Sequence, residues 1–263
     1  MRIVVLVKPV PDTASGGERL RPDDWRLDRA AVPAVVNAND EYALEAALKL
    51  TEAHGGEVVL VSMAGAGAPD TMRKALAMGA TRGVLISDPA LEGSCTWATT
   101  RVLAAALATL EFDLAFAGVD TSDGGAGVVP AGIAALAGLP YLSYAAEIEP
   151  DATARTVRVR RITATGYDVL EAGMPALISG TQALGEPRYP SLKGIMAARS
   201  KEITTLSLAD LGIDPSTVGQ AGATTKLMES TPPPPRAATR IIRETPDEAA
   251  RQLVEFLAER RLI

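Results

Sequence analysis

Residues 58–87 read VVLVSMAGAGAPDTMRKALAMGATRGVLIS, and the fold class is clearest in this stretch. Val58 to Ser62 and Gly83 to Ser87 are short apolar runs rich in β-branched residues, which is typical of strands buried on both faces. Between them, Pro69 lies near the first turn of a helical segment and Gly79 lies just past its last turn. The order strand, helix, strand predicts a parallel βαβ unit.

The same alternation continues on both sides of this unit. Further buried strands are predicted at Ile3 to Val7 and at Leu114 to Ala117, and further helices at 39–54, 94–110 and 127–136. A loop rich in proline, glycine and charge is expected from Lys8 to about Val36. Repeated alternation favours an α/β fold with a doubly wound, mostly parallel sheet and helices on both faces.

The pattern changes after residue 140. Segments 141–148, 156–163 and 167–172 alternate or run apolar with short turns between them, which predicts an attached β-meander, and 175–181 is a further strand. Regular periodicity is weak over 204–236, where TPPPPR at 231–236 is expected to be extended polyproline II. We therefore expect an α/β domain over 1–203 and an extended arm over 204–263.

The arm ends in a predicted helix. Thr245-Pro246-Asp247-Glu248 is interpreted as a capping box with proline at the first helical position. The stripe that follows is apolar and consists of Ala249, Leu253, Phe256 and Leu257. A helix with such a stripe must dock on a surface, either its own domain or a partner.

Composition excludes several function classes. The 263 residues carry a net charge of −6 and only 4% aromatic side chains, so neither a basic face nor a stacking surface for nucleic acid is expected. Cys95 and His54 are the single residues of their types, which leaves little for a disulfide, a metal cluster or a Ser-His-Asp mechanism. We expect Cys95 to be an inert thiol within a helix and His54 to mark a helix end. No apolar run is long enough for a signal peptide or a membrane span, which favours a cytoplasmic location.

Ligands of open α/β sheets bind beyond the carboxyl ends of the strands. The candidate segments there are Lys8 to Asp12, Ser62 to Gly65 and the loop GVDTSDGGAG at 118–127. The last loop is glycine-rich and leads into a helix, so it is suited to a phosphate, although such turns also occur without a ligand. Asp123, in this loop, is interpreted either as a contact to a ribose or as a plain helix cap. Neither a P-loop nor a GxGxxG motif is present.

Two further segments carry candidate residues. Asn37 to Tyr42 places several polar groups at a helix start, and Asn39 is either a ligand contact or a plain cap. Gly185 to Ile203 is locally basic and surrounds Leu192 and Met196 with charge. This second segment is either an ordinary entry into a helix or a partner-docking site.

The chain resembles the β subunits of electron transfer flavoproteins. The resemblance rests on five segments in order, VKPVPD at 7–12, NANDEYALEAALKL at 37–50, MRKALAMGATRGV at 72–84, DGGAG at 123–127 and PRYPSLKGIMAARSKEI at 187–203. It implies a heterodimer with an α subunit that shares FAD with this chain, a structural AMP in this chain, and a role as an electron carrier rather than a stand-alone enzyme. It also implies flavin-dependent dehydrogenases as clients, a quinone-reducing oxidoreductase as acceptor, and an arm that embraces the α subunit.

Carried over by position, the resemblance implies two sets of site residues. The AMP pocket would consist of Leu6, Asn37, Ala38, Asn39, Asp40, Met63, Asp123, Gly124, Gly125, Ala126, Gly127, Val128 and Val129. The partner-recognition loop, at about 185–200, would use Arg188, Tyr189, Leu192, Lys193, Ile195 and Met196, with Leu192 as its anchor.

The glycine-rich loop departs from the family pattern. Many members have DGDTGQVGP where this chain has DGGAGVVPA, so an acid, a hydroxyl and an amide are lost at Gly125, Ala126 and Val128. AMP is the expected nucleotide. The alternatives are a second FAD in the same pocket, as in the electron-bifurcating branch of the family, and an adenine-nucleotide scaffold or sensor.

Overall fold

The computed structural model describes all residues except 232, 236–238 and 240. The chain divides into two compact units, Met1–Leu227 and Met228–Ile263. This division lies later than the expected boundary at 203, because β11 (Ile203–Leu206) pairs in parallel with β5 (Arg82–Ile86). The expected polyproline segment at 231–236 lies partly outside the described residues.

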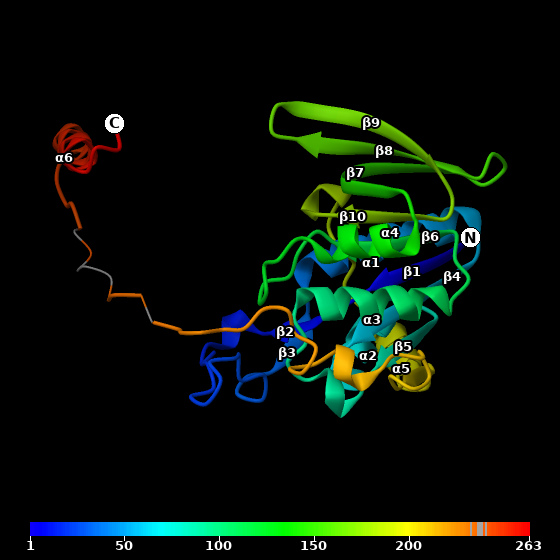
Figure 1. Ribbon diagram of the computed structural model, residues 1–263. Helices are drawn as coiled ribbons and strands as arrows, with labels where there is room; N and C mark the ends of the chain where they lie inside the picture. The colour runs from blue at the N-terminus through cyan, green and yellow to red at the C-terminus, as the bar shows by residue number, and fades with distance from the viewer. Residues whose placement is uncertain (232, 236–238, 240) are drawn as a thin grey trace. The chain divides into compact units, whose positions relative to one another are not determined.

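The first unit is built on one large sheet. Its remaining strands are β1 (Arg2–Leu6), β4 (Glu57–Met63), β6 (Leu114–Gly118), β7 (Tyr141–Asp151), β8 (Thr156–Thr163), β9 (Gly166–Gly173) and β10 (Ala176–Gly180). The nine strands follow the order β11-β5-β4-β1-β6-β10-β7-β8-β9. Pairing is parallel from β11 to β7 and antiparallel from β7 to β9. The predicted parallel sheet and the attached meander, which forms one edge in Figure 1, are both confirmed.

Helices cover both faces of the sheet, as predicted. Helices α1 (Ala38–His54), α2 (Ala68–Met78) and α5 (Leu192–Ala198) pack on one face, and α3 (Thr96–Ala108) and α4 (Val129–Ala137) pack on the other. The residues of β1 alternate between the two cores, with Ile3 and Val5 in the first and Val4 and Leu6 in the second. A strand with both faces buried needs this continuous apolar run.

Three local expectations are corrected. The loop over 8–36 contains a short antiparallel pair, β2 (Pro9–Pro11) and β3 (Ala34–Val36). Cys95 is the N-cap of α3 and does not lie within it. Burial opposes ionisation of this thiol, but hydrogen bonds from amides at the helix start and from Thr224 lower its pKa to about 6, so it ionises more readily than the ordinary thiol that was expected.

The second unit ends in α6 (Pro246–Glu259), which begins with proline as predicted. The expected capping box does not form, because the Glu248 carboxylate accepts hydrogen bonds from Arg251 and Gln252 and Thr245 makes no side-chain cap. In the described chain, none of the residues of α6 is buried. None of the described helices combines the length and the apolar character that a membrane crossing requires.

Candidate functional site

The carboxyl ends of β1, β4 and β6 lie side by side. The register pairs Leu6 of β1 with Val61 of β4, and Val5 of β1 with Phe116 of β6. The segments after these strands therefore meet at one edge of the sheet, and they include Lys8, Met63 and the loop after Gly118. This edge is where the sequence predicts a ligand.

Asp40, in the first turn of α1, ties this edge together. Its carboxylate accepts the backbone N–H of Lys8 at 2.8 Å and that of Gly118 at 3.1 Å. The residue is only 4% exposed, and this burial raises the pKa of Asp40 to about 7. A side chain at Gly118 would place its Cβ 2.4 Å from the Asp40 Oδ1 atom, so only glycine fits there.

Two asparagines join the start of α1 to the loop after β6. Asn37 is buried; its Nδ2 atom donates to the Asp120 carbonyl at 2.8 Å, and its Oδ1 accepts the Ser122 N–H at 3.2 Å. Asn39 does not cap the helix, because Asn37 occupies the N-cap position. Instead the Asn39 Nδ2 atom donates to the Asp120 carboxylate at 2.7 Å. Ala38 between them is exposed.

Asp123 gathers two cations beside the glycine-rich loop. Its side chain is 2% exposed; the Lys8 Nζ atom lies 2.8 Å from its Oδ1, and Arg29 pairs with its Oδ2. Burial opposes ionisation, but the hydrogen bonds from Lys8 and Arg29 lower the pKa of Asp123 to about 2. Asp123 does not cap α4, whose N-cap is Val128.

The glycine-rich loop itself is open to solvent. Residues 124–128 are exposed, and Gly125 and Gly127 have left-handed φ angles of 55° and 64°. Among the described residues, the backbone amides of Ala126, Gly127 and Val128 donate to no protein acceptor. The apolar side of this edge consists of three predicted residues that belong to one apolar cluster of the sheet, namely Leu6, Met63 and Val129. The structure thus brings the predicted AMP residues to one edge.

Sequence reasoning missed part of this constellation. Arg29 lies in a long loop that gives no signal of where it folds, and Asp120 accepts both asparagine amides without being singled out. A separate hollow of about 420 Å³ lies between α3 and α4, lined mainly by alanine and leucine, and none of the predicted nucleotide residues lines it. Its one cation, Arg101, already donates to the Thr217 carbonyl.

The second candidate region lies in the segment 185–200. Ser191 caps the short helix α5, with its hydroxyl accepting the Gly194 N–H at 3.0 Å. Tyr189 is 96% exposed and Leu192 is 77% exposed, and Ile195, Met196 and Lys193 are exposed beside them. The structure therefore presents a cluster of large apolar side chains to solvent, as predicted for a docking site.

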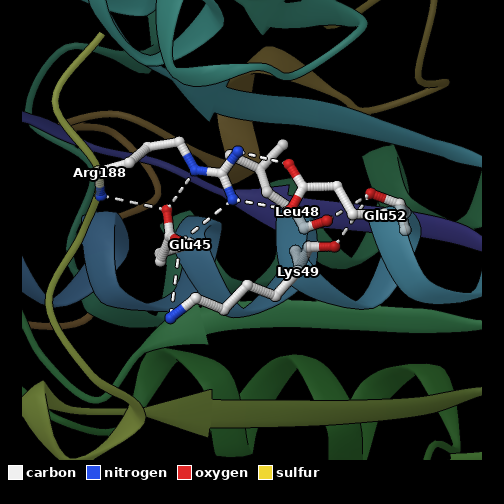
Figure 2. A network of polar contacts seen from close by, with 7 residues as sticks. Glu45, Leu48, Lys49, Glu52 and Arg188 are labelled. Atoms are coloured by element: carbon white, nitrogen blue, oxygen red, sulfur yellow. Dashed lines mark hydrogen bonds and ion pairs between the residues drawn. The ribbon is translucent and has the colours of Figure 1, made fainter.

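Arg188 at the base of this segment does not reach outward in the same way. Figure 2 shows its guanidinium between two carboxylates of α1, Glu45 and Glu52. The Arg188 Nε atom donates to the Glu45 Oε2 at 2.8 Å, and its Nη2 atom donates to the Glu52 Oε2 at 3.0 Å. Burial opposes ionisation of Glu45, but the hydrogen bonds that it accepts from the side chain and backbone of Arg188 lower its pKa.

Comparison with known proteins identifies the family of this chain. A family model described as the Electron transfer flavoprotein domain matches residues 24–211. The chain is 40% identical to the electron transfer flavoprotein subunit beta of Mycobacterium leprae, over 99% of both chains. It is 35% identical to the protein of that name in Thermoanaerobacterium thermosaccharolyticum and to the caffeyl-CoA reductase-Etf complex subunit CarD of Acetobacterium woodii, over 100% of each chain. The chain therefore belongs to the electron transfer flavoprotein family, among its β subunits.

Proposed function

We propose that this chain works as the β subunit of a cytoplasmic heterodimer that accepts electrons from flavin-dependent dehydrogenases and passes them to a quinone-reducing oxidoreductase. FAD held with the α subunit would supply the redox chemistry when bound. The observation that carries the proposal is the combination of two preformed regions, a polar edge with free backbone donors and an exposed apolar segment on a fixed base. The arm would hold the α subunit through α6, whose apolar stripe is unburied in the described chain.

The polar edge is suited to the phosphate of a nucleotide. The free amides of Ala126, Gly127 and Val128 lie at the start of α4, where the helix dipole also favours an anion. Lys8 and Arg29 add positive charge beside them. An ideal Cβ at Gly125 would meet no atom within 4 Å, so the loop leaves room for a ligand. These features fit a phosphate even though the loop lacks the side chains common in the family.

AMP is the nucleotide we propose for this edge. The loop residues Gly124 to Val128 offer backbone donors but no side-chain donor or acceptor. Backbone recognition of this kind is suited to a phosphate common to AMP and FAD, so the loop chemistry alone does not separate them. The alternative to test is a second FAD in this pocket, which the resemblance implies for the electron-bifurcating branch of the family. The Acetobacterium relative is named as a subunit of a caffeyl-CoA reductase-Etf complex.

Nucleotide content tests this assignment directly. The chain is purified with its α partner, denatured, and the released nucleotides are identified by mass-resolved chromatography. One FAD and one AMP per heterodimer is the expected result. Two FAD molecules and no AMP would make the polar edge part of a redox centre, and one FAD without any second nucleotide would contradict nucleotide binding here and favour a scaffold role.

Client docking is proposed for the segment that carries Arg188, Tyr189, Leu192, Lys193, Ile195 and Met196, in which Arg188 forms the base and the other five side chains are exposed to a partner. Leu192 is the anchor, because a large exposed apolar side chain among charges gains most from entering a partner's pocket. We expect Leu192→Ala to raise the KM of a client dehydrogenase for the heterodimer about tenfold, with flavin content unchanged. Leu136→Ala, on α4 and also exposed, is the control. Unaltered dehydrogenase kinetics in Leu192→Ala would contradict the docking role.

A further inference from the structure

The exposed segment 185–200 is held to the first unit at both of its ends. At its far end, the Arg73 Nη1 atom of α2 donates to the Ala198 carbonyl at 2.7 Å, and the Lys201 Nζ atom donates to the Leu76 carbonyl at 3.0 Å. At its near end, Arg188 is bound to α1. Between these attachments the large apolar side chains face solvent.

The near attachment uses every nitrogen of the Arg188 guanidinium. The Nε and Nη2 atoms donate to Glu45, and the Nη1 and Nη2 atoms donate to Glu52. The backbone N–H of Arg188 adds a further bond to the Glu45 Oε2, at 3.1 Å. Its side chain and its main chain are therefore both fixed to one helix, and a partner would have to break these bonds to use the guanidinium.

Glu45 makes this attachment specific for arginine. Its side chain is only 4% exposed and receives one further cation, Lys49, at 3.6 Å. A buried carboxylate needs directed donors, and a planar guanidinium supplies two parallel ones where an ammonium supplies a single point charge. Lysine at position 188 would therefore keep the charge of the segment and lose the fixed geometry (Figure 2).

We infer that Arg188 is a positioning residue that sets the orientation of the docking segment through Glu45 and Glu52, and is not itself a contact to the client. This inference rests on the proposed docking function. Tyr189 follows Arg188 directly and Leu192, the first residue of α5, lies four residues after it, so a loose base would leave the anchor in many orientations. Restricting the anchor before encounter removes an ordering cost that the complex would otherwise bear.

The test uses the purified heterodimer, with its flavin, and a client dehydrogenase. Arg188→Lys is compared with Arg199→Gln, which removes a charge from an exposed side chain of the same segment. We expect Arg188→Lys to raise the KM for the heterodimer about five- to tenfold with kcat unchanged. Amide hydrogen exchange over residues 186–196 should also become faster, while exchange in α1 stays the same. Arg199→Gln should alter neither measurement.

Milder and paired variants keep the test informative if Arg188→Lys folds poorly. Glu52→Gln alters the more exposed acceptor and should give the same two effects at a smaller size. In a double-mutant cycle, Arg188→Gln and Glu45→Gln should be strongly non-additive, since both remove one attachment. Additive effects would overturn the inference.

The two proposals fail in different ways. If Leu192→Ala raises KM while Arg188→Lys changes neither KM nor amide exchange, docking stands and the positioning role of Arg188 is overturned. Equal KM effects in Arg188→Lys and Arg199→Gln would also overturn it, because a change anywhere in the segment would then weaken docking, whether or not it disturbs the attachment to α1. If Leu192→Ala has no kinetic effect, the docking proposal is wrong. In that case, unchanged amide exchange in Arg188→Lys would overturn the positioning role of Arg188 as well. Faster amide exchange in Arg188→Lys would still support that positioning role.

Discussion

The polar edge and the docking segment differ in where their polar side chains point. At the edge, polar side chains turn toward one another, and Asp40 and Asp123 are almost completely enclosed by donors. In the docking segment, the polar contacts to α1 and α2 lie at the two ends, and the middle exposes Tyr189 and Leu192. The first arrangement is the one we propose for an anion, and the second is the one we propose for an apolar contact with a partner.

The helix α1 contacts both regions, and this fixes the position of one region relative to the other. Asp40 in the first turn of α1 binds the ends of β1 and β6, and Glu45, five residues later, binds the base of the docking segment. Both are buried carboxylates on a rigid element packed on the sheet. A buried acid is costly unless its donors are fixed, so each one enforces the geometry of the backbone or side chain that it binds.

Within these two regions, the largest effect is expected from a side chain at Gly118. An ideal Cβ there would lie 2.4 Å from the Asp40 Oδ1, 2.6 Å from the Asn39 Cβ and 2.8 Å from the Asn39 carbonyl carbon. We expect Gly118→Ala to lower the free energy of unfolding by about 3 kcal/mol in urea denaturation. Gly65→Ala is the control, because its Cβ would meet nothing within 4 Å. A loss as small as the control's would show that the edge is not tightly packed.

The second prediction concerns the pH dependence that buried Asp40 imposes. Burial raises its pKa to about 7, against about 3.9 in an unfolded chain, so the folded protein binds more protons between these values. The free energy of unfolding therefore falls as pH rises through this window, by roughly 3 kcal/mol from pH 5 to pH 8. Asp40→Asn should remove this fall.

Urea denaturation of both proteins at pH 5 and pH 8 checks the expectation. Subtracting the Asp40→Asn values removes the contribution of Cys95, whose lowered pKa gives a slope of the opposite sign over part of this range. Parallel pH profiles for the two proteins would mean that Asp40 stays ionised in the folded state, stabilised by its two N–H donors.

The sequence predicts the frame of both regions better than their details. Strands such as Ile3 to Val7 and the 58–87 unit carry continuous apolar runs, and burial on both faces makes that signal strong. The sequence pattern does not predict β11 (Ile203–Leu206). This strand lies at the edge of the sheet and has two exposed threonines, so it lacks the continuous apolar run of a buried strand. Its place beside β5 depends on tertiary pairing.

Within the two regions, local features can be predicted from the sequence, whereas long-range ion pairs cannot. The loop 118–127 was predicted from its own glycines and its place after a strand, both local features. The partners of its Asp123 come from positions 8 and 29, and those of Arg188 come from positions 45 and 52. Such long-range ion pairs leave no periodic signal in a single sequence, so the fixed base of the docking segment emerges only from the fold.

A smaller effect is expected where the docking segment approaches α2. A Cβ at Gly194 would lie 2.4 Å from the Ala77 carbonyl oxygen, which belongs to a helix backbone and cannot move away cheaply. We expect Gly194→Ala to lower the free energy of unfolding by about 1–2 kcal/mol and to shift α5 away from α2. Gly173→Ala, with open space around it, is the control. Unchanged amide exchange over 192–198 would contradict this close contact.

The smallest effect on stability is expected at the anchor itself. Leu192 is 77% exposed and buries little surface in its own unit, so Leu192→Ser should change the free energy of unfolding by no more than about 0.5 kcal/mol. The matched core variant is Leu44→Ala, at a fully buried position of α1, which should cost about 2–5 kcal/mol. Urea denaturation of the two variants separates a side chain kept for a partner from one kept for folding. A loss above 1 kcal/mol in Leu192→Ser would mean that Leu192 packs within its own unit. The docking segment would then not differ from the polar edge in the way proposed, because its anchor would contribute to folding.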